Sequence, residues 1–350
     1  MKHFKFYTKH DILLATRVRK FETKIGEIVQ PLLADADWVD NLGRSNAKYI
    51  LLGVPEDLGM KANQATTDEC LSWFHFLACF LNIQSNDFLT GEDILLLGHF
   101  DFTDLKELIE ANATSTEEKT EAYRHAVTQV DEEVEKLIKV ITQFKKIPII
   151  IGGGQNNAYP AIKGAAKGLL KAGAVPLAQI NCINLGSNAH YQAMEGRHSG
   201  NSFRYADEDG YLNKYCIVGL DENHLQQNVW KDITENPFVD FITYEDIFLH
   251  EKKNFIQAVA YAAEFTEDTY TGIDVDITCI EDAGNGSNFT GLQARQFITF
   301  VATDVDVAYL QICESPNTHA DHKIHLNKGK LISHLVADFI KAHSALMPLD

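Results

Sequence analysis

The chain has 350 residues, of which 45% are hydrophobic and 23% charged, and its formal net charge is −18. This composition is typical of a globular protein with enough apolar material for one large α/β domain or two ordinary ones. The negative charge repels phosphate backbones and anionic lipid, so we expect neither nucleic acid nor a membrane surface as a partner.

The chain carries no signal that would send it out of the cytoplasm. No window approaches 18 uninterrupted apolar residues, and the first residues lack the apolar segment of a signal peptide. The six cysteines form no CxxC pair and fall mostly in apolar stretches, as buried free thiols do in a reducing compartment. We therefore expect a cytoplasmic protein without a disulfide framework.

Apolar periodicity predicts strands and helices that alternate along the chain. Residues 8–40 are expected to be helical, and residues 1–44 to form a helical extension of a single domain over 1–350. We predict eight strands, over 48–57, 93–102, 147–157 (ending in a glycine turn), 177–185, 215–222, 238–247, 269–278 and 307–315, and helices over 69–84, 115–145, 158–171, 251–265, 290–303 and 327–345.

This alternation predicts an α/β fold with a parallel sheet covered by helices on both faces. A closed (β/α)8 barrel is the rival topology, because the strand count alone fits it. In either fold the carboxyl ends of the strands line the functional face.

Polar residues follow four of the predicted strands: the glycine turn 152–157, the run 186–190, the pair Asp274 and Asp276, and the run 313–315. Residues two apart in a strand point to the same side, so both carboxylates would project together. Such a pair is either a set of loop acids that cap backbone amides or a divalent cation site. Four such strand ends together favour a shared pocket.

An ordered set of short motifs resembles the ureohydrolase superfamily of arginase, agmatinase and formimidoylglutamase. The set comprises the glycine turn, "EGRHSGN" (195–201), "GIDVDIT" (272–278) and "ICES" (312–315), while "GVPEDLG" (53–59) and "NIQSND" (82–87) look most like the formimidoylglutamase branch. The resemblance implies a three-layer α/β/α sandwich with an eight-stranded, mostly parallel sheet. It also implies hydrolysis of a guanidine or formimino C–N bond by a hydroxide that bridges two Mn²⁺ ions.

Most of the metal ligands that the resemblance implies are replaced in this sequence. The His after the glycines falls on Gln155, and an Asp-x-His-x-Asp run falls on Gly186, Asn188 and His190. (A register two residues later would place it on Asn188, His190 and Gln192.) Only the Asp-x-Asp pair is complete. Its two carboxylates cannot balance the four positive charges of two Mn²⁺ ions, and neutral amides contribute dipoles but no charge. We therefore expect no dinuclear Mn cluster. Asp274, Asp276 and His190 could still hold a single divalent ion, which would lower the pKa of a bound water.

Two further residues match positions that the resemblance associates with substrate. Glu314 fits a carboxylate that binds a cationic substrate head, and His198 fits a loop histidine that moves protons or contacts substrate. Each could equally be a structural group bonded to backbone. Arg197 and Arg204 could grip a substrate carboxylate, or pair with nearby acids. We interpret the cluster of His319, Asp321, His322 and His325 as a solvated loop.

Three functions remain open from the sequence. The first is a ureohydrolase with a degenerate metal site and little or no activity. The second is an active hydrolase of amidine-type C–N bonds that uses one metal or none, in the latter case with Asp276 or His190 as the general base. The third is a non-catalytic partner subunit of an active relative. A small cationic or amidine-type molecule is the expected ligand, and the resemblance implies a homo-oligomer.

Overall fold

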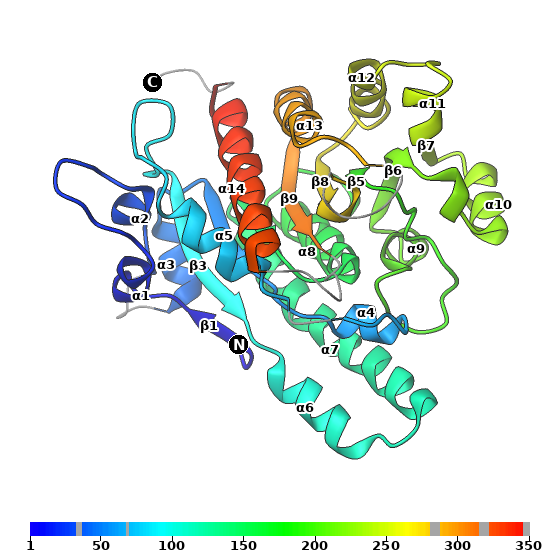
Figure 1. Cartoon of the computed structure of the whole chain (residues 1–350), viewed down its shortest axis with the longest axis horizontal. Helices are drawn as coiled ribbons and strands as arrows, with labels where there is room; N and C mark the ends of the chain where they lie inside the picture. The colour runs from blue at the N-terminus through cyan, green and yellow to red at the C-terminus, as the bar shows by residue number, and fades with distance from the viewer. Residues whose placement is uncertain (33–36, 68–69, 281–287, 315–321, 346–350) are drawn as a thin grey trace.

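A single nine-stranded sheet forms the centre of the molecule, with the strand order β1-β3-β2-β4-β9-β8-β5-β6-β7 (Figure 1). The computed structural model describes residues 1–32, 37–67, 70–280, 288–314 and 322–345. The strands are β1 (Phe4–Phe6), β2 (Tyr49–Gly53), β3 (Ile94–Phe100), β4 (Ile147–Ile151), β5 (Ile180–Leu185), β6 (Leu212–Leu220), β7 (Val239–Thr243), β8 (Thr271–Asp276) and β9 (Val307–Cys313).

The sheet is open, with β1 and β7 at its edges, so the predicted α/β sandwich is confirmed and the closed barrel is wrong. Strands β2 to β9 are the eight predicted strands, and they pair in parallel. The ninth strand, β1, was not predicted, and it pairs antiparallel with β3. Its three residues are too few to show an alternation in the sequence.

The N-terminal region is not one helical stretch. Within residues 8–40 the structure has the short helices α1 (Lys9–Leu14) and α2 (Ile25–Ile28) and the start of α3 (Trp38–Arg44). Thr8 caps α1 through its side chain, and the helix ends before Ala15, from which an irregular segment runs to α2. The predicted continuous helix is therefore wrong, because the apolar spacing of Leu13, Leu14 and Val18 does not mark a buried face: all three side chains are exposed.

Helices cover both faces of the sheet and build two separate hydrophobic cores. The first core joins α5, α12, α13 and α14 to one face, and the second joins chiefly α7 and α8 to the other. The remaining helices are α4 (Leu58–Ala62), α5 (Ser72–Phe80), α6 (Thr103–Asn112), α7 (Thr116–Gln143), α8 (Ala158–Lys171), α9 (Ser202–Glu208), α10 (Gln227–Glu235), α11 (Tyr244–Phe248), α12 (Phe255–Phe265), α13 (Gly291–Asp304) and α14 (His322–Ala345).

Strand β2 shows why the strands read as continuous apolar runs. Tyr49 and Leu51 pack into the first core, whereas Ile50 and Leu52 pack into the second. Successive side chains of a strand point to opposite faces, so a strand covered on both sides is apolar at most of its positions.

Two predicted strands are too long. The strand predicted over 48–57 is β2, which stops at Gly53. Residues 238–247 were expected to be extended, but β7 stops at Thr243 and α11 begins at Tyr244. The Thr243 side chain accepts a hydrogen bond from the Asp246 backbone N–H and so caps the helix.

The topology brings together the four strand ends that carry polar residues. Strands β4, β9, β8 and β5 are neighbours in the middle of the sheet. Their carboxyl ends therefore meet at one edge, where ligands bind in open α/β sheets. The sequence predicted a pocket shared by all four ends. Within the described residues, only the ends of β5 and β8 among these four line the cavity described below, so the prediction is wrong for the ends of β4 and β9.

Candidate active site at the central strand ends

A cavity of about 370 Å³ opens at the carboxyl ends of β5, β6 and β8. Its lining is mostly polar and uncharged, and its histidine and carboxylate members are His190, His224 and Asp276. Ser187, Asn188, Gln192 and Thr278 also line it. Residues 187–190 and the second aspartate of β8 thus reach the cavity, whereas Gly186 does not line it.

Asp274 lies outside this lining and is completely buried. Its Oδ2 accepts hydrogen bonds from the Tyr309 hydroxyl at 2.7 Å and the Cys182 thiol at 3.1 Å, and its Oδ1 accepts one from the Gln155 amide at 3.1 Å. Burial raises the pKa of Asp274 to about 6, against the lowering effect of these three donors. Both carboxylate oxygens are therefore engaged by side chains of the protein itself.

The Tyr309 ring reaches Asp274 only because its neighbour on β8 is a glycine. Gly272 pairs with Tyr309 across the β8–β9 ladder, and a Cβ on Gly272 would come within 2.3 Å of the tyrosine ring. A side chain at position 272 would displace the ring, since packed interiors leave no room for extra carbon atoms. The contact between Tyr309 and Asp274 is therefore built into two strands.

The positions of the implied ligand run show no metal-binding geometry. Gln155 is buried, and its amide carbonyl accepts from the Cys313 thiol while its NH₂ group donates to Asp274. Gly186 supplies no side chain, and Asn188 is exposed with its amide directed to the Ser187 hydroxyl.

Asp276 and His190 face the cavity together. His190 Nε2 lies 3.9 Å from Asp276 Oδ2, and His190 Nδ1 donates to the Ser199 carbonyl at 2.9 Å. Asp276 Oδ1 accepts from both the backbone N–H and the hydroxyl of Thr278. Burial alone would raise the pKa of Asp276, but His190 and the Thr278 donors outweigh it and hold that pKa below its usual value.

These residues do not fit a pair of Mn²⁺ ions. Both oxygens of Asp274 already accept hydrogen bonds from the protein, Gln155 and Asn188 are neutral amides, and Gly186 has no side-chain ligand atom. Within the described residues, Asp274, Asp276 and His190 also do not bring their ligand atoms within 4.8 Å of one another. A single ion would therefore find two ligands, Asp276 and His190, rather than the predicted three.

His198 is fully buried and does not belong to the cavity lining. Its Nδ1 accepts from the Gly200 backbone N–H, and its Nε2 lies 3.7 Å from Glu195. Burial, together with the positive charges of Arg124 and Arg197, lowers the pKa of His198 to about 4. His198 therefore does not reach the cavity, although His190 bonds the carbonyl of the next residue, Ser199.

Neither of the two candidate arginines points into the cavity. Arg197 is buried, pairs with Asp131 at 2.8 Å, bonds Asn201 and lies over the rings of Tyr159 and Tyr205. Arg204 pairs with Asp232. The interpretation that they pair with acids holds, although the partners differ from the sequence neighbours Glu195 and Asp207.

Glu314 is buried on the other side of the glycine turn. Its backbone N–H donates to the Gly153 carbonyl, while its carboxylate lies 3.9 Å from both the Cys70 thiol and the Lys328 ammonium. It does not line the cavity that holds Asp276. His319 and Asp321 lie outside the described residues, and so do the side chains of His322 and His325.

The sequence argument missed Glu56, a buried carboxylate that organises the glycine turn. Its Oε1 accepts from the side chains of Asn156 and Asn157, and its Oε2 from the backbone of Leu58. Burial raises the pKa of Glu56 despite these donors. The Pro-Glu-Asp sequence after β2 was visible, but nothing in it indicated the turn that it contacts.

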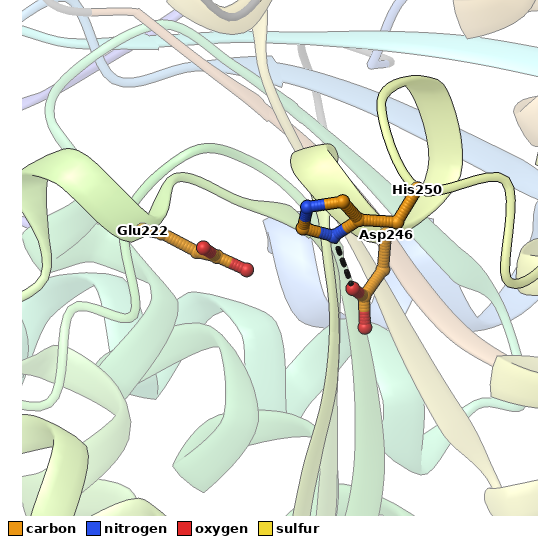
Figure 2. Close-up of side chains that lie close together, drawn as sticks. All are labelled: Glu222, Asp246 and His250. Carbon is orange, nitrogen blue, oxygen red and sulfur yellow. Dashed lines mark hydrogen bonds and ion pairs between the residues drawn. The ribbon is translucent and has the colours of Figure 1, made fainter.

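A second group of ionisable side chains lies on the outer rim, where Glu222, Asp246 and His250 come close together (Figure 2). His250 Nδ1 lies 3.2 Å from Asp246 Oδ1, but the Lys252 ammonium contacts the same oxygen at 2.7 Å. The Glu222 carboxylate accepts from the Thr243 hydroxyl. Because a lysine already neutralises the central acid, this group carries no metal assignment.

Comparison with known proteins defines the class to which this fold belongs. The model of the arginase family matches residues 48–310. The chain therefore belongs to the arginase family, and its open parallel sheet is the fold of that family.

Formimidoylglutamases are among the most similar relatives, which confirms the predicted resemblance to that branch. Formimidoylglutamase from Streptococcus pyogenes serotype M5 is 26% identical over 159 residues, or 43% of this chain and 46% of the relative. The match thus spans about half the length of the curated relatives. The Bacillus subtilis formimidoylglutamase structure has a TM-score of 0.69 at 14% identity and 95% coverage of both chains. Formiminoglutamase from Trypanosoma cruzi with Mn²⁺ has a TM-score of 0.67 at 15% identity, covering 93% of this chain and 100% of that one.

The sequence also made predictions about the cysteines and about membrane-spanning helices. All six cysteines are free, as the sequence indicated. In the part of the chain that the structure describes, none of the helices has the length and apolarity needed to cross a bilayer.

Proposed function

We propose that this arginase-family protein is a metal-independent binding protein for a small amidine-type or amine cation, with little or no hydrolytic activity. The observation that carries the proposal is that both oxygens of the Asp274 carboxylate accept hydrogen bonds from Tyr309, Cys182 and Gln155. To bind a metal, the Asp274 carboxylate would have to break its hydrogen bonds to these three donors. The donors would then be buried without hydrogen-bond partners, which is energetically unfavourable.

The open side of the cavity supports a ligand that donates hydrogen bonds. His190 donates through Nδ1 to a carbonyl, so in its neutral form Nε2 is an acceptor, and it lacks a hydrogen-bond partner within the described residues. Asp276 Oδ2 lies beside it as a second acceptor. An amidinium or ammonium group supplies both N–H donors and the charge that a buried carboxylate requires. The net charge of −18 adds a field that attracts cations.

The single-metal alternative has less support from the described residues. It relies on Asp274, whose two oxygens are already engaged, and this leaves a site of two ligands for the ion. The partner-subunit alternative remains a prediction.

The first test measures metal on chelator-treated protein that has been incubated with Mn²⁺ and desalted. We expect less than about 0.1 Mn per chain by elemental analysis, because two carboxylates, one of them occupied, cannot hold two dications. A reproducible value near two per chain would refute the metal-free site.

The second test uses calorimetric titration with formamidinium, guanidinium and agmatine, with and without Mn²⁺. We expect metal-independent binding that weakens at least tenfold in Asp276→Asn, since that variant removes the negative charge but keeps the shape. Glu222→Gln on the outer rim is the matched control and should leave the affinity unchanged. If the protein hydrolysed the ligand above the background rate and lost this activity on chelation, it would be a metal-dependent hydrolase instead.

A further inference from the structure

One edge of the molecule presents an apolar surface surrounded by positive charge. The side chains of Leu14, Val18 and Phe21 are 74%, 60% and 96% exposed. Arg17, Arg19 and Lys20 lie between them and are also exposed. We call residues 13–21 the basic-apolar loop.

The loop is held firmly rather than hanging free. Asn82 accepts from the Arg17 backbone N–H at 2.7 Å and donates to the Ala15 carbonyl at 3.0 Å. Beyond the loop, the Thr23 carbonyl accepts from the Ser85 backbone N–H. A surface that is already ordered loses little conformational entropy when a partner covers it.

Phe21 combines full exposure with an unfavourable backbone conformation. Its φ is +67°, in the left-handed region that bulky side chains rarely adopt. Contacts within this chain do not offset that strain, because the Phe21 ring packs against little besides the Lys20 ammonium. Strain of this kind occurs where a side chain is held ready for a ligand.

The charge distribution indicates an acidic protein surface as the partner. Residues 1–24 carry seven Lys and Arg against two Asp and Glu, a formal charge of +5, which leaves −23 on the rest of the chain. The acidic remainder of a second copy therefore attracts the basic-apolar loop. An anionic membrane, in contrast, repels the acidic remainder of the chain.

A complementary surface lies between α6 and α7, at a different edge of the molecule from α1 (Figure 1). It is a hollow of about 450 Å³ lined by Leu105, Leu108, Ile109, Ala113, Ala122 and Ala126, with Glu118 at its rim. Glu107, Glu117 and Glu121 are exposed on the same two helices. The hollow is apolar inside and acidic around it, which is the reverse of the basic-apolar loop.

We propose that the basic-apolar loop of one copy docks into the α6–α7 hollow of a second copy, with Phe21 as the inserted side chain. Loop and hollow are different patches, so the contact is heterologous and repeats from copy to copy until a ring closes. The proposal is independent of the proposed ligand-binding function, because neither patch contains a residue of the cavity.

The decisive variant is Phe21→Gly, because glycine accepts a positive φ without strain. We expect its melting temperature to stay the same or rise, while sedimentation velocity shows self-association weakened at least tenfold. Leu249→Ser removes another exposed apolar side chain, 69% exposed, outside both patches and should associate like the parent chain. A parent chain that remains monomeric at 100 μM, or a Phe21→Gly variant with unchanged association, would overturn the proposal.

A charge exchange tests the pairing itself. Lys substitutions at the exposed Glu107, Glu117 and Glu121 should abolish association with the parent loop. Mixing with an Arg17→Glu, Arg19→Glu, Lys20→Glu variant should restore association in the mixed species. Failure of the mixture to associate would refute this receiving surface. Co-sedimentation of the parent chain, but not Phe21→Gly, with phosphatidylserine vesicles would instead assign the loop to a lipid surface and overturn the self-docking proposal.

Discussion

The two aspartates of β8 are separated by one residue, yet they lie in different environments. Asp274 is closed inside the protein by Tyr309, Cys182 and Gln155, whereas Asp276 shares the cavity wall with His190. Their pKa shifts differ accordingly: burial raises the pKa of Asp274 to about 6, while His190 and Thr278 hold the pKa of Asp276 below its usual value.

The difference teaches that two carboxylates one residue apart on a strand can be placed in separate environments, one held by internal donors and the other open to a cavity. A buried carboxylate without a counter-charge is costly, so it must gain other partners. Tyr309 provides the shortest of these contacts to Asp274, and Gly272 provides its space. Asp276 keeps an open side and is the acid that remains able to meet a ligand. If Asp274 is closed off and Asp276 is accessible, substitutions around the two aspartates should have different effects.

The largest expected effect is on metal binding. The variant Gln155→His, Gly186→Asp, Asn188→His, His190→Asp supplies the ligand set that the family resemblance implies. We expect it to bind Mn²⁺ poorly until Tyr309→Phe is added, because the tyrosine hydroxyl occupies an oxygen of Asp274. Calorimetric titration should show at least a tenfold gain in Mn²⁺ affinity on that addition.

Adding Tyr309→Phe to the unaltered chain is the control for this experiment, and it should create no Mn²⁺ site. If the four-substitution variant bound two Mn²⁺ tightly with Tyr309 intact, Asp274 would not be closed off as its contacts indicate. The contrast between the two aspartates would then have no chemical consequence.

The next effect is on stability and tests the space beneath Tyr309. Gly272→Ala places a Cβ within 2.3 Å of a ring that is fixed between two strands. We expect a loss of about 2–3 kcal/mol in the free energy of unfolding, measured with urea, as for other overpacked cores. Gly291→Ala meets its nearest neighbour at 3.6 Å and should change stability by less than about 0.5 kcal/mol. Equal effects at both positions would contradict a tightly fitted ring.

A smaller effect follows from the hydroxyl of Tyr309 alone. Tyr309→Phe keeps the ring and removes a hydrogen bond to a carboxylate, so we expect a loss of about 1.5–3 kcal/mol. Tyr49→Phe is the matched control, because its buried hydroxyl meets the neutral partners His343 and Ser344. It should cost about 1 kcal/mol. A Tyr309→Phe variant no less stable than Tyr49→Phe would show that Asp274 does not depend on this donor.

The sequence predicted the sheet far better than the site. Eight largely apolar runs predicted all eight parallel strands, because a strand covered on both faces is apolar at most of its positions. The three-residue strand β1 and the end of β7 at Thr243 had no such signal. At the site, the motifs located Asp274, Asp276 and His190. They could not indicate that Tyr309, 35 residues from Asp274, closes one of them, because that contact exists only when β8 and β9 pair.

The smallest expected effect concerns His198, which the family resemblance associated with proton transfer. Burial lowers its pKa to about 4, so the folded protein keeps it neutral while the unfolded chain takes up a proton near pH 6.5. Its contribution to stability is therefore complete above pH 6.5 and is lost as the pH falls towards 4. Its imidazole NMR signals, identified by their absence in His198→Asn, should not shift between pH 5.5 and 8. In the same variant, the free energy of unfolding should fall less than in the parent chain between pH 6.5 and 5. A signal that titrates near pH 6.5 would return His198 to the list of proton-transfer groups, because a general acid or base works best with a pKa near the operating pH.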